Sequence, residues 1–143
     1  MAMNDRRDVF IVDGSRTPQI KARGRPGPFS ASDLAVGAGR ALLMRHDFDL
    51  GKLDEVIIGC VMPSEDEANI GRVIALRLGV PQTVPAWTVQ RNCASGMQSI
   101  DSAFHNIASG QADLILAGGV EAMSRAPVIY NSTMVHWLGD LMQ

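Results

Sequence analysis

Short apolar runs alternate along the chain with stretches of helical periodicity, and this alternation most constrains its fold. The runs span residues 9–12, 56–61, 86–89 and 114–117. Each is short, continuous and bordered by glycine, proline or charge, as is typical of a strand buried on both faces. The order strand, helix, strand, helix, strand, helix, strand predicts a three-layer α/β fold with a mostly parallel sheet and right-handed crossovers.

The three predicted helices have recognisable start and stop signals. The first begins at a capping box opened by Ser30 and ends near His46. The second begins at Asn69 and stops at Gly79. The third follows residue 93, ends at Gly110 and has the clearest amphipathic pattern. Its apolar residues recur at three- and four-residue steps: Met97, Ile100, Phe104 and Ile107.

Length, charge and cysteine count exclude several classes of protein. With 143 residues, the chain is long enough for one domain with a sizeable core. The net charge of −2 argues against general nucleic-acid binding, and no apolar run approaches the ~20 residues that span a bilayer. The two cysteines form no disulfide framework and have no metal-site spacing. We therefore expect a cytoplasmic protein without nucleic-acid or membrane partners and without a metal.

Cys93 lies where the third apolar run gives way to the third helix. A thiol at a helix N-terminus meets unpaired backbone N–H groups and the positive end of the helix dipole, which favour the thiolate. Its neighbours Ala94, Ser95 and Gly96 are small and leave room for a substrate. Most free cysteines are small buried hydrophobes, and Cys60, inside an apolar run, is expected to be one. Cys93 is instead predicted to be a nucleophile that carries an acyl group.

Other polar residues are weaker candidates. A basic loop after the first apolar run contains Arg16, Lys21, Arg23 and Arg25. Such a run is more typical of a solvated loop than of a site for a nucleotide's phosphates. Glu121 either orients a catalytic neighbour or, as we favour, is paired in the interior. His105 lies ~18 Å along a helix from Cys93 and is expected to face solvent or a partner.

Four stretches together resemble the N-terminal part of a thiolase, an acetyl-CoA acyltransferase: residues 16–18, 68–72, 92–96 and 112–124. The resemblance implies a ping-pong reaction in which Cys93 attacks an acyl-CoA, while its backbone N–H helps to stabilise the oxyanion. The acyl group then passes to acetyl-CoA or, during thiolysis of a 3-ketoacyl-CoA, to coenzyme A. Acyl-CoA and coenzyme A are therefore the implied substrates, with no tightly bound cofactor.

The resemblance also implies that this thiolase-like fold is incomplete. Thiolases resemble two similar α/β halves with a loop region inserted in the first, and they form dimers or tetramers. The histidine that activates the nucleophile and a second, acid–base cysteine belong to the second half. Residues 1–126 are thus expected to form an N-terminal α/β domain that lacks its final strand. Residues 127–143, where the apolar pattern loses its register, are expected to begin the loop region.

Two alternatives stay open at this point. A β-ketoacyl synthase has a similar fold and also places an acyl cysteine at a helix start, although residues 16–18 and 69–72 favour a thiolase. A fragment that pairs through an exposed sheet edge or a dimer face would need no chemistry. On the thiolase interpretation, Cys93 is expected to be alkylated, but the isolated chain is expected not to turn over thioesters.

Overall fold

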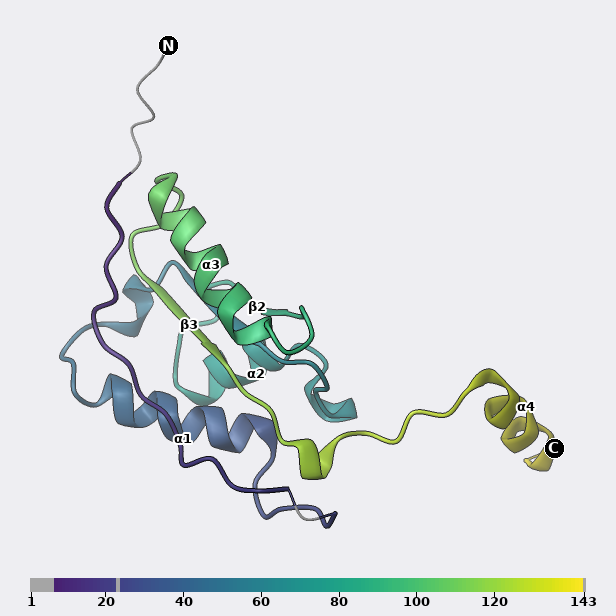
Figure 1. Ribbon diagram of the computed structural model, residues 1–143. Coiled ribbons are helices and arrows are strands. Elements are labelled where there is room, and N and C mark those ends of the chain that lie inside the picture. Colours follow the sequence, from purple (N-terminus) through teal and green to yellow (C-terminus); the bar gives the residue numbers. More distant parts are fainter. Residues whose placement is uncertain (1–6, 23, 143) are drawn as a thin grey trace.

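The computed structural model describes residues 7–22 and 24–142, and a parallel sheet lies at its centre (Figure 1). The sheet has three strands: β1 (Glu55–Gly59), β2 (Ala86–Val89) and β3 (Ile115–Gly119). Their order is β2-β1-β3, so the first of them in sequence is central. Val56 in β1 is paired with Ala86 on one side and with Leu116 on the other. The predicted α/β fold with parallel strands is confirmed.

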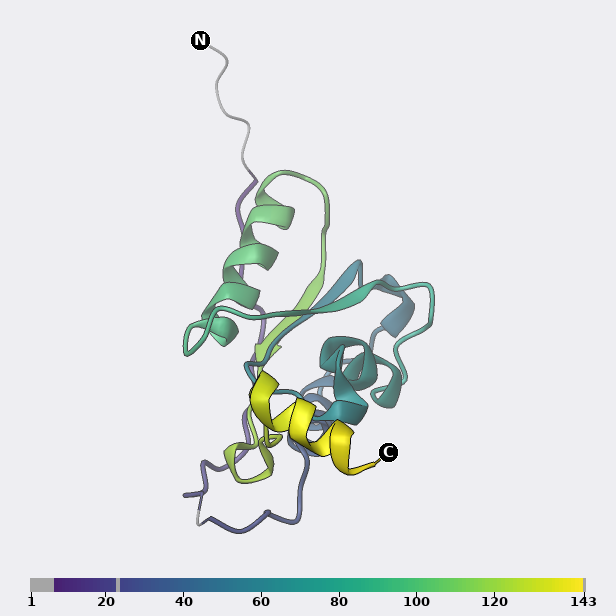
Figure 2. The same cartoon turned by 90° about the vertical axis from the view of Figure 1, so that its right-hand side faces the viewer.

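Helices cover both faces of this sheet, which makes three layers (Figures 1 and 2). On one face, α2 (Ile70–Arg77) contacts β1 and β2, and α1 (Ala31–Leu43) packs on α2. On the other face, α3 (Ser95–Ala108) contacts β1 and β3. Val56 of β1 and Ile74 of α2 are buried in one apolar cluster, which is the main core.

The first two helices have the capping residues that the sequence predicts. At the start of α1, the Ser30 hydroxyl accepts from Asp33 N–H, and the Asp33 carboxylate accepts from Ser30 N–H. The Asn69 side chain caps α2, and Gly79, with φ +86°, follows its end. Three short 3₁₀ helices lie in the connections: η1 (Leu50–Lys52), η2 (Glu65–Glu67) and η3 (Met123–Arg125).

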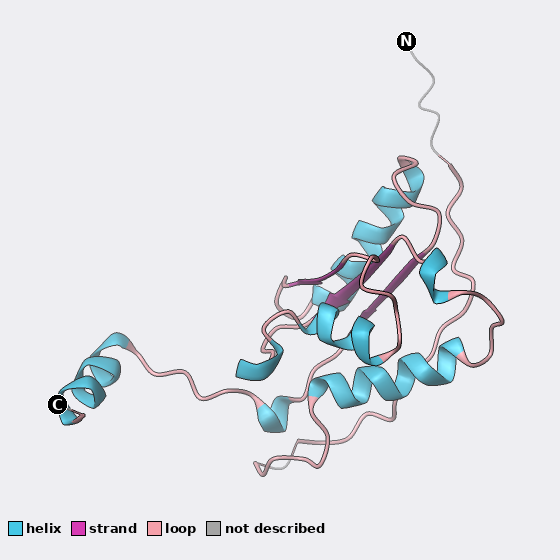
Figure 3. Cartoon of the chain, turned by 180° about the vertical axis from the view of Figure 1, so that it is seen from behind, coloured by secondary structure: helices cyan, strands magenta, loops and turns pink. Residues whose placement is uncertain are grey.

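The prediction of a buried strand at residues 9–12 is wrong. The segment is extended but pairs with no strand among the described residues, as its loop colouring in Figure 3 shows. Phe10 and Ile11 are 78% and 86% exposed. An apolar run becomes a strand only when a neighbouring edge completes its hydrogen bonds, and here no such edge reaches it.

Polar contacts at both ends hold this N-terminal segment in place. Arg7 N–H donates to the Ala108 carbonyl at 3.2 Å. At the other end, the Asp13 carboxylate lies 2.9 Å from the Arg45 guanidinium and 2.7 Å from His46. The hydrogen bond with His46, followed by those from the Gly14 N–H and Arg45, lowers the pKa of Asp13 to about 2. The segment is therefore fixed by its termini and not by its apolar centre.

Helix α3 approaches the sheet closely because glycines meet at the contact. A Cβ atom on Gly59 would lie 2.3 Å from the Ser95 carbonyl carbon, and one on Gly119 would lie 2.7 Å from the Gly96 Cα. The buried side chains of α3 are correspondingly small: Ser95, Ser99, Ala103 and Ala108. The apolar stripe of the helix faces outward instead, and Met97 is 69% exposed.

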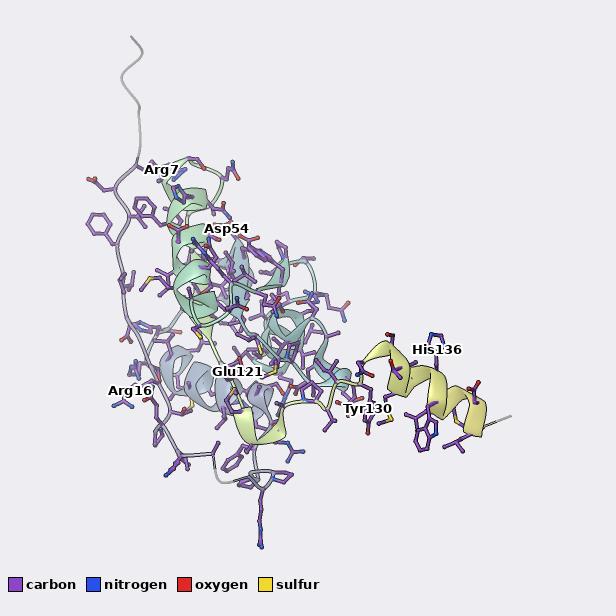
Figure 4. The ribbon with its side chains drawn as sticks, turned by 45° about the vertical axis from the view of Figure 1, so that its right-hand side comes forward. Arg7, Arg16, Asp54, Glu121, Tyr130 and His136 are labelled. Carbon is purple, nitrogen blue, oxygen red and sulfur yellow. The ribbon has the colours of Figure 1, made fainter. Side chains whose placement is uncertain are left out.

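The C-terminal part of the chain leads away from this body. Helix α4 (Ser132–Leu141), capped by Asn131, has no buried residue. Figure 4 shows Tyr130 and His136 on this arm, well apart from Glu121. A division of the chain after residue 126 stays a prediction. Among the described residues, no helix combines the length and apolar character needed to cross a bilayer.

The close contact between Gly59 and the start of α3 predicts how substitutions of glycine change stability. Gly59→Ala forces the start of α3 away from the strand and should lower the free energy of unfolding by about 3 kcal/mol. Gly37→Ala, at an exposed position of α1 with nothing within 4 Å, is the matched control and should raise it by ~0.5–1 kcal/mol. Urea unfolding followed by circular dichroism measures both. Equal stability of the two variants would contradict the close approach.

Candidate active site

Cys93 is an exposed free thiol in the tight connection between β2 and α3. Asn92, immediately before it, has φ +48°, a left-handed conformation that asparagine tolerates better than most residues. Ala94 N–H donates to the Arg91 carbonyl at 3.1 Å, and Ser95 N–H donates to the Asn92 carbonyl at 3.0 Å. The thiol is thus presented at the carboxyl end of a strand by a fixed turn.

Two buried serines hold this turn against the fold. Ser95 Oγ accepts from Arg91 N–H at 2.8 Å and donates to the Asn92 carbonyl at 2.7 Å. Ser99 Oγ lies 2.7 Å from the carbonyl oxygens of both Gly96 and Gly118. Sequence reasoning treated Ser95 only as a small neighbour of Cys93. The sequence feature that could have predicted this role is a serine in the first helical turn, where hydroxyls commonly form hydrogen bonds with nearby backbone groups.

The helix start beside Cys93 has free backbone donors. Ala94 occupies the N-cap position and its side chain accepts no hydrogen bond. Among the described residues, the N–H groups of Gly96 and Met97 have no acceptor. Such N–H groups, together with the positive end of the helix dipole, favour a negatively charged atom at this place. The surroundings of the sulfur therefore suit an anionic nucleophile or oxyanion.

An open depression of about 370 Å³ lies next to this turn on the outer face of α3. Its lining includes the outward stripe of the helix, with Met97, Ile100 and Phe104. Arg91 borders it and donates to Gln98 Oε1 at 2.5 Å. The depression is mostly apolar and adjoins the cysteine turn, which suits an acyl chain or an apolar surface of another polypeptide.

Cys60, in contrast, is a buried thiol at the end of β1. Burial and then the charge of Glu121 raise its pKa to about 12. The Glu121 carboxylate accepts from Val61 N–H at 2.9 Å and from Met62 N–H at 3.3 Å. Cys60 is therefore packed as predicted, and Glu121, which is half-buried, is paired with backbone N–H groups as the sequence favoured. Figure 4 shows the position of Glu121.

The histidines do not join this site. Among the described residues, no side chain forms a hydrogen bond with the Cys93 sulfur. His105 lies in the last turn of α3, 3.6 Å from Asp101, and His136 lies on the distant arm (Figure 4). Within the described ranges, no group of three or more histidine, cysteine or acidic residues is arranged to hold a metal ion. The described residues thus place no hydrogen-bonded base beside the Cys93 sulfur.

The basic loop is not gathered into a site. Arg16, Lys21 and Arg25 are exposed, and Arg16 donates to the neighbouring Thr17 carbonyl at 3.3 Å. Arg23 lies outside the described residues. A role for this loop in phosphate binding stays the less favoured prediction.

The family of the chain follows from comparison with known proteins. The family described as "Thiolase, N-terminal domain" matches residues 9–139. This chain belongs to the thiolase family. It is 45% identical to a beta-ketoadipyl-CoA thiolase of Pseudomonas knackmussii over 125 residues. This match covers 86% of this chain and 31% of that protein. It is also 40% identical to a 3-ketoacyl-CoA thiolase of Acinetobacter baumannii over 132 residues, and this match covers 91% of this chain and 34% of that protein.

A solved thiolase-family structure has the same fold over most of this chain. The crystal structure of the Bacillus anthracis acetyl-CoA acetyltransferase matches with a TM-score of 0.68 and 40% identity, covering 74% of this chain and 27% of that one. The chain therefore spans about a third of the length of the curated relatives that it matches. The family assignment also decides between thiolase and β-ketoacyl synthase in favour of thiolase.

The contrast between the two thiols predicts selective alkylation. Iodoacetamide at pH 7 should modify exposed Cys93 at least ~100-fold faster than Cys60, because only the thiolate reacts and Cys60 has a pKa of about 12. Peptide mass spectrometry over time measures both rates, with the urea-unfolded chain as the control in which they should converge. Similar rates in the folded chain would mean that Cys93 is not free to react.

Proposed function

We propose that this thiolase-family chain contributes the acyl-carrying nucleophile, Cys93, of an enzyme that transfers acyl groups to and from coenzyme A. The observation that carries the proposal is the exposed thiol in a fixed turn, beside the free N–H groups of Gly96 and Met97. A nucleophile needs an approach path and a place for developing negative charge. This turn offers both.

The proposed chemistry has two steps. In the first, the Cys93 sulfur bonds to the carbonyl carbon of an acyl-CoA thioester, the carbon–sulfur bond to coenzyme A breaks, and coenzyme A leaves as its thiol with the proton from Cys93. Backbone N–H groups at the turn, that of Cys93 included, stabilise the tetrahedral oxyanion. In the second, the α-carbon of acetyl-CoA loses a proton to a base and bonds to the acyl carbon, while the thioester bond to Cys93 breaks and its sulfur takes up a proton. In thiolysis, the Cys93 sulfur bonds to the 3-keto carbon of a 3-ketoacyl-CoA, the bond between C2 and C3 breaks, and acetyl-CoA leaves after its α-carbon takes up a proton. The thiol of coenzyme A then takes the acyl group and Cys93 regains a proton.

We further propose a 3-ketoacyl-CoA as the substrate class. Support comes from the relatives, which are named for beta-ketoadipyl-CoA and 3-ketoacyl-CoA. The proposal includes a base and a second, acid–base cysteine supplied by polypeptide beyond these 143 residues, because no described side chain forms a hydrogen bond with the Cys93 sulfur. A dimer or tetramer and a cytoplasmic location belong to the same proposal. A non-catalytic interaction fragment is the alternative, favoured by the exposed apolar stripe of α3.

The isolated chain should show a reactive Cys93 without turnover. Purified chain mixed with acetoacetyl-CoA and coenzyme A should give no sustained thiolysis, because the activating base is missing. Thiolysis is followed by the loss of the 3-ketoacyl-CoA absorbance. Steady turnover above the rate of the Cys93→Ser variant would contradict the predicted need for a further segment.

A second experiment tests whether Cys93 is the nucleophile. When the C-terminal two thirds of a thiolase relative are supplied in the same polypeptide, acetyl-CoA should add one acetyl group to Cys93, seen by intact and peptide mass spectrometry. Cys93→Ser should abolish the adduct, and Cys60→Ser is the matched control that should retain it. An adduct that persists in the Cys93→Ser chimera, or none in a chimera that turns over substrate, would refute the assignment.

A further inference from the structure

A larger cavity, of about 620 Å³, lies beyond the carboxyl ends of β1 and β3 and is separate from the depression beside α3. Its walls come from the loop after β1, the start of α1 and the segment after β3. The polar lining residues used below are Ser30, Ser64, Glu65, Asp66, Glu67 and Arg125. Parallel sheets commonly bind ligands at this edge, and the acyl-transfer proposal makes no use of the cavity.

Glu67, one of its lining residues, has an unsatisfied carboxylate oxygen. The residue is 8% exposed. Its Oε1 accepts from the hydroxyls of Ser30, at 3.2 Å, and Ser32. Its Oε2 is buried and has no hydrogen-bond partner among the described residues. Buried charges are normally paired or bound to an ion, and an unpartnered one is strongly disfavoured.

Among the described residues, no basic side chain forms a direct ion pair with this carboxylate. Glu65 and Asp66 line the same cavity. The guanidinium of Arg125 donates to the Gly27 carbonyl at 2.8 Å. The guanidinium of Arg77, which reaches the Ser32 hydroxyl, forms its ion pair with the Asp33 carboxylate at 2.6 Å. The cavity is therefore negative on balance, and it suits a cation rather than a phosphate.

We propose that this cavity binds a small monovalent cation of the size of K⁺ or NH₄⁺, with Glu67 Oε2 as the charged ligand. Hydroxyl oxygens of the lining serine side chains complete its oxygen shell. A divalent ion fits less well, because within the described ranges no group of three or more acidic, histidine or cysteine side chains converges. The ion stabilises the loop after β1, which Gln90, near Cys93, also contacts through the Val61 carbonyl at 2.8 Å.

Thermal unfolding of the 143-residue chain tests this site. Chloride salts of K⁺ and NH₄⁺ are compared with tetramethylammonium chloride, whose cation is too bulky for a buried carboxylate, at equal ionic strength. We expect a saturable rise in Tm of ~3 °C with the small cations only. Glu67→Gln should remove this rise, and Asp66→Asn, a neighbouring carboxylate in the same cavity, should keep it. Equal Tm in all salts, or a rise that survives in Glu67→Gln, overturns the proposal.

A measurement on the unsubstituted chain covers the case in which Glu67→Gln fails to fold. Backbone amide signals of residues 64–67 and 124–126 should shift saturably with added K⁺, and not with tetramethylammonium. Shifts that are linear in salt, equal for both cations or spread over the whole chain indicate screening alone and overturn the proposal.

Discussion

The contact between the first turn of α3 and the ends of two strands determines the rest of this structure. Gly59 and Gly119 have no side chains, so the backbone of Ser95 and Gly96 lies directly on β1 and β3. A helix that starts this close must turn sharply out of β2, and Asn92 takes the required left-handed conformation. Cys93 is thereby carried at the top of the turn, outside the packed layers. The exposure of Cys93 is therefore a consequence of the close packing of Ser95 and Gly96, which follow it, against the two strands.

Two thiols at the same edge of the sheet have opposite exposure: Cys60 is buried and Cys93 is exposed. Cys60 directly follows the central strand β1, where burial and the Glu121 charge oppose ionisation of the thiol. Cys93 follows the edge strand β2, whose end is not covered. Strand position therefore separates a buried thiol from an exposed one, even though both residues lie at carboxyl ends of parallel strands. This supports the assignment of the acyl-carrying role to Cys93 alone.

Local signals in the sequence predicted most of the secondary structure, whereas contacts between distant residues escaped prediction. The Ser30 capping box and the position of Cys93 follow from neighbours within a few residues. The extended segment at 9–12 did not become a strand, because apolar composition cannot specify which edge will pair with it. Likewise, Glu67 finds its partners more than thirty residues away, and no periodicity reveals them. Helix α4 was missed because its apolar residues face no core that would impose a register.

Apolar side chains are exposed on several parts of this structure. The outward stripe of α3, the segment at 9–12 and helix α4 all carry exposed apolar side chains, and exposed apolar patches commonly mark contact sites for other polypeptide. The relatives are about three times as long as the matched region, which supports the proposal that further polypeptide packs on these surfaces. The cysteine turn borders one of them, and the groups that would activate Cys93 are then best supplied across that contact.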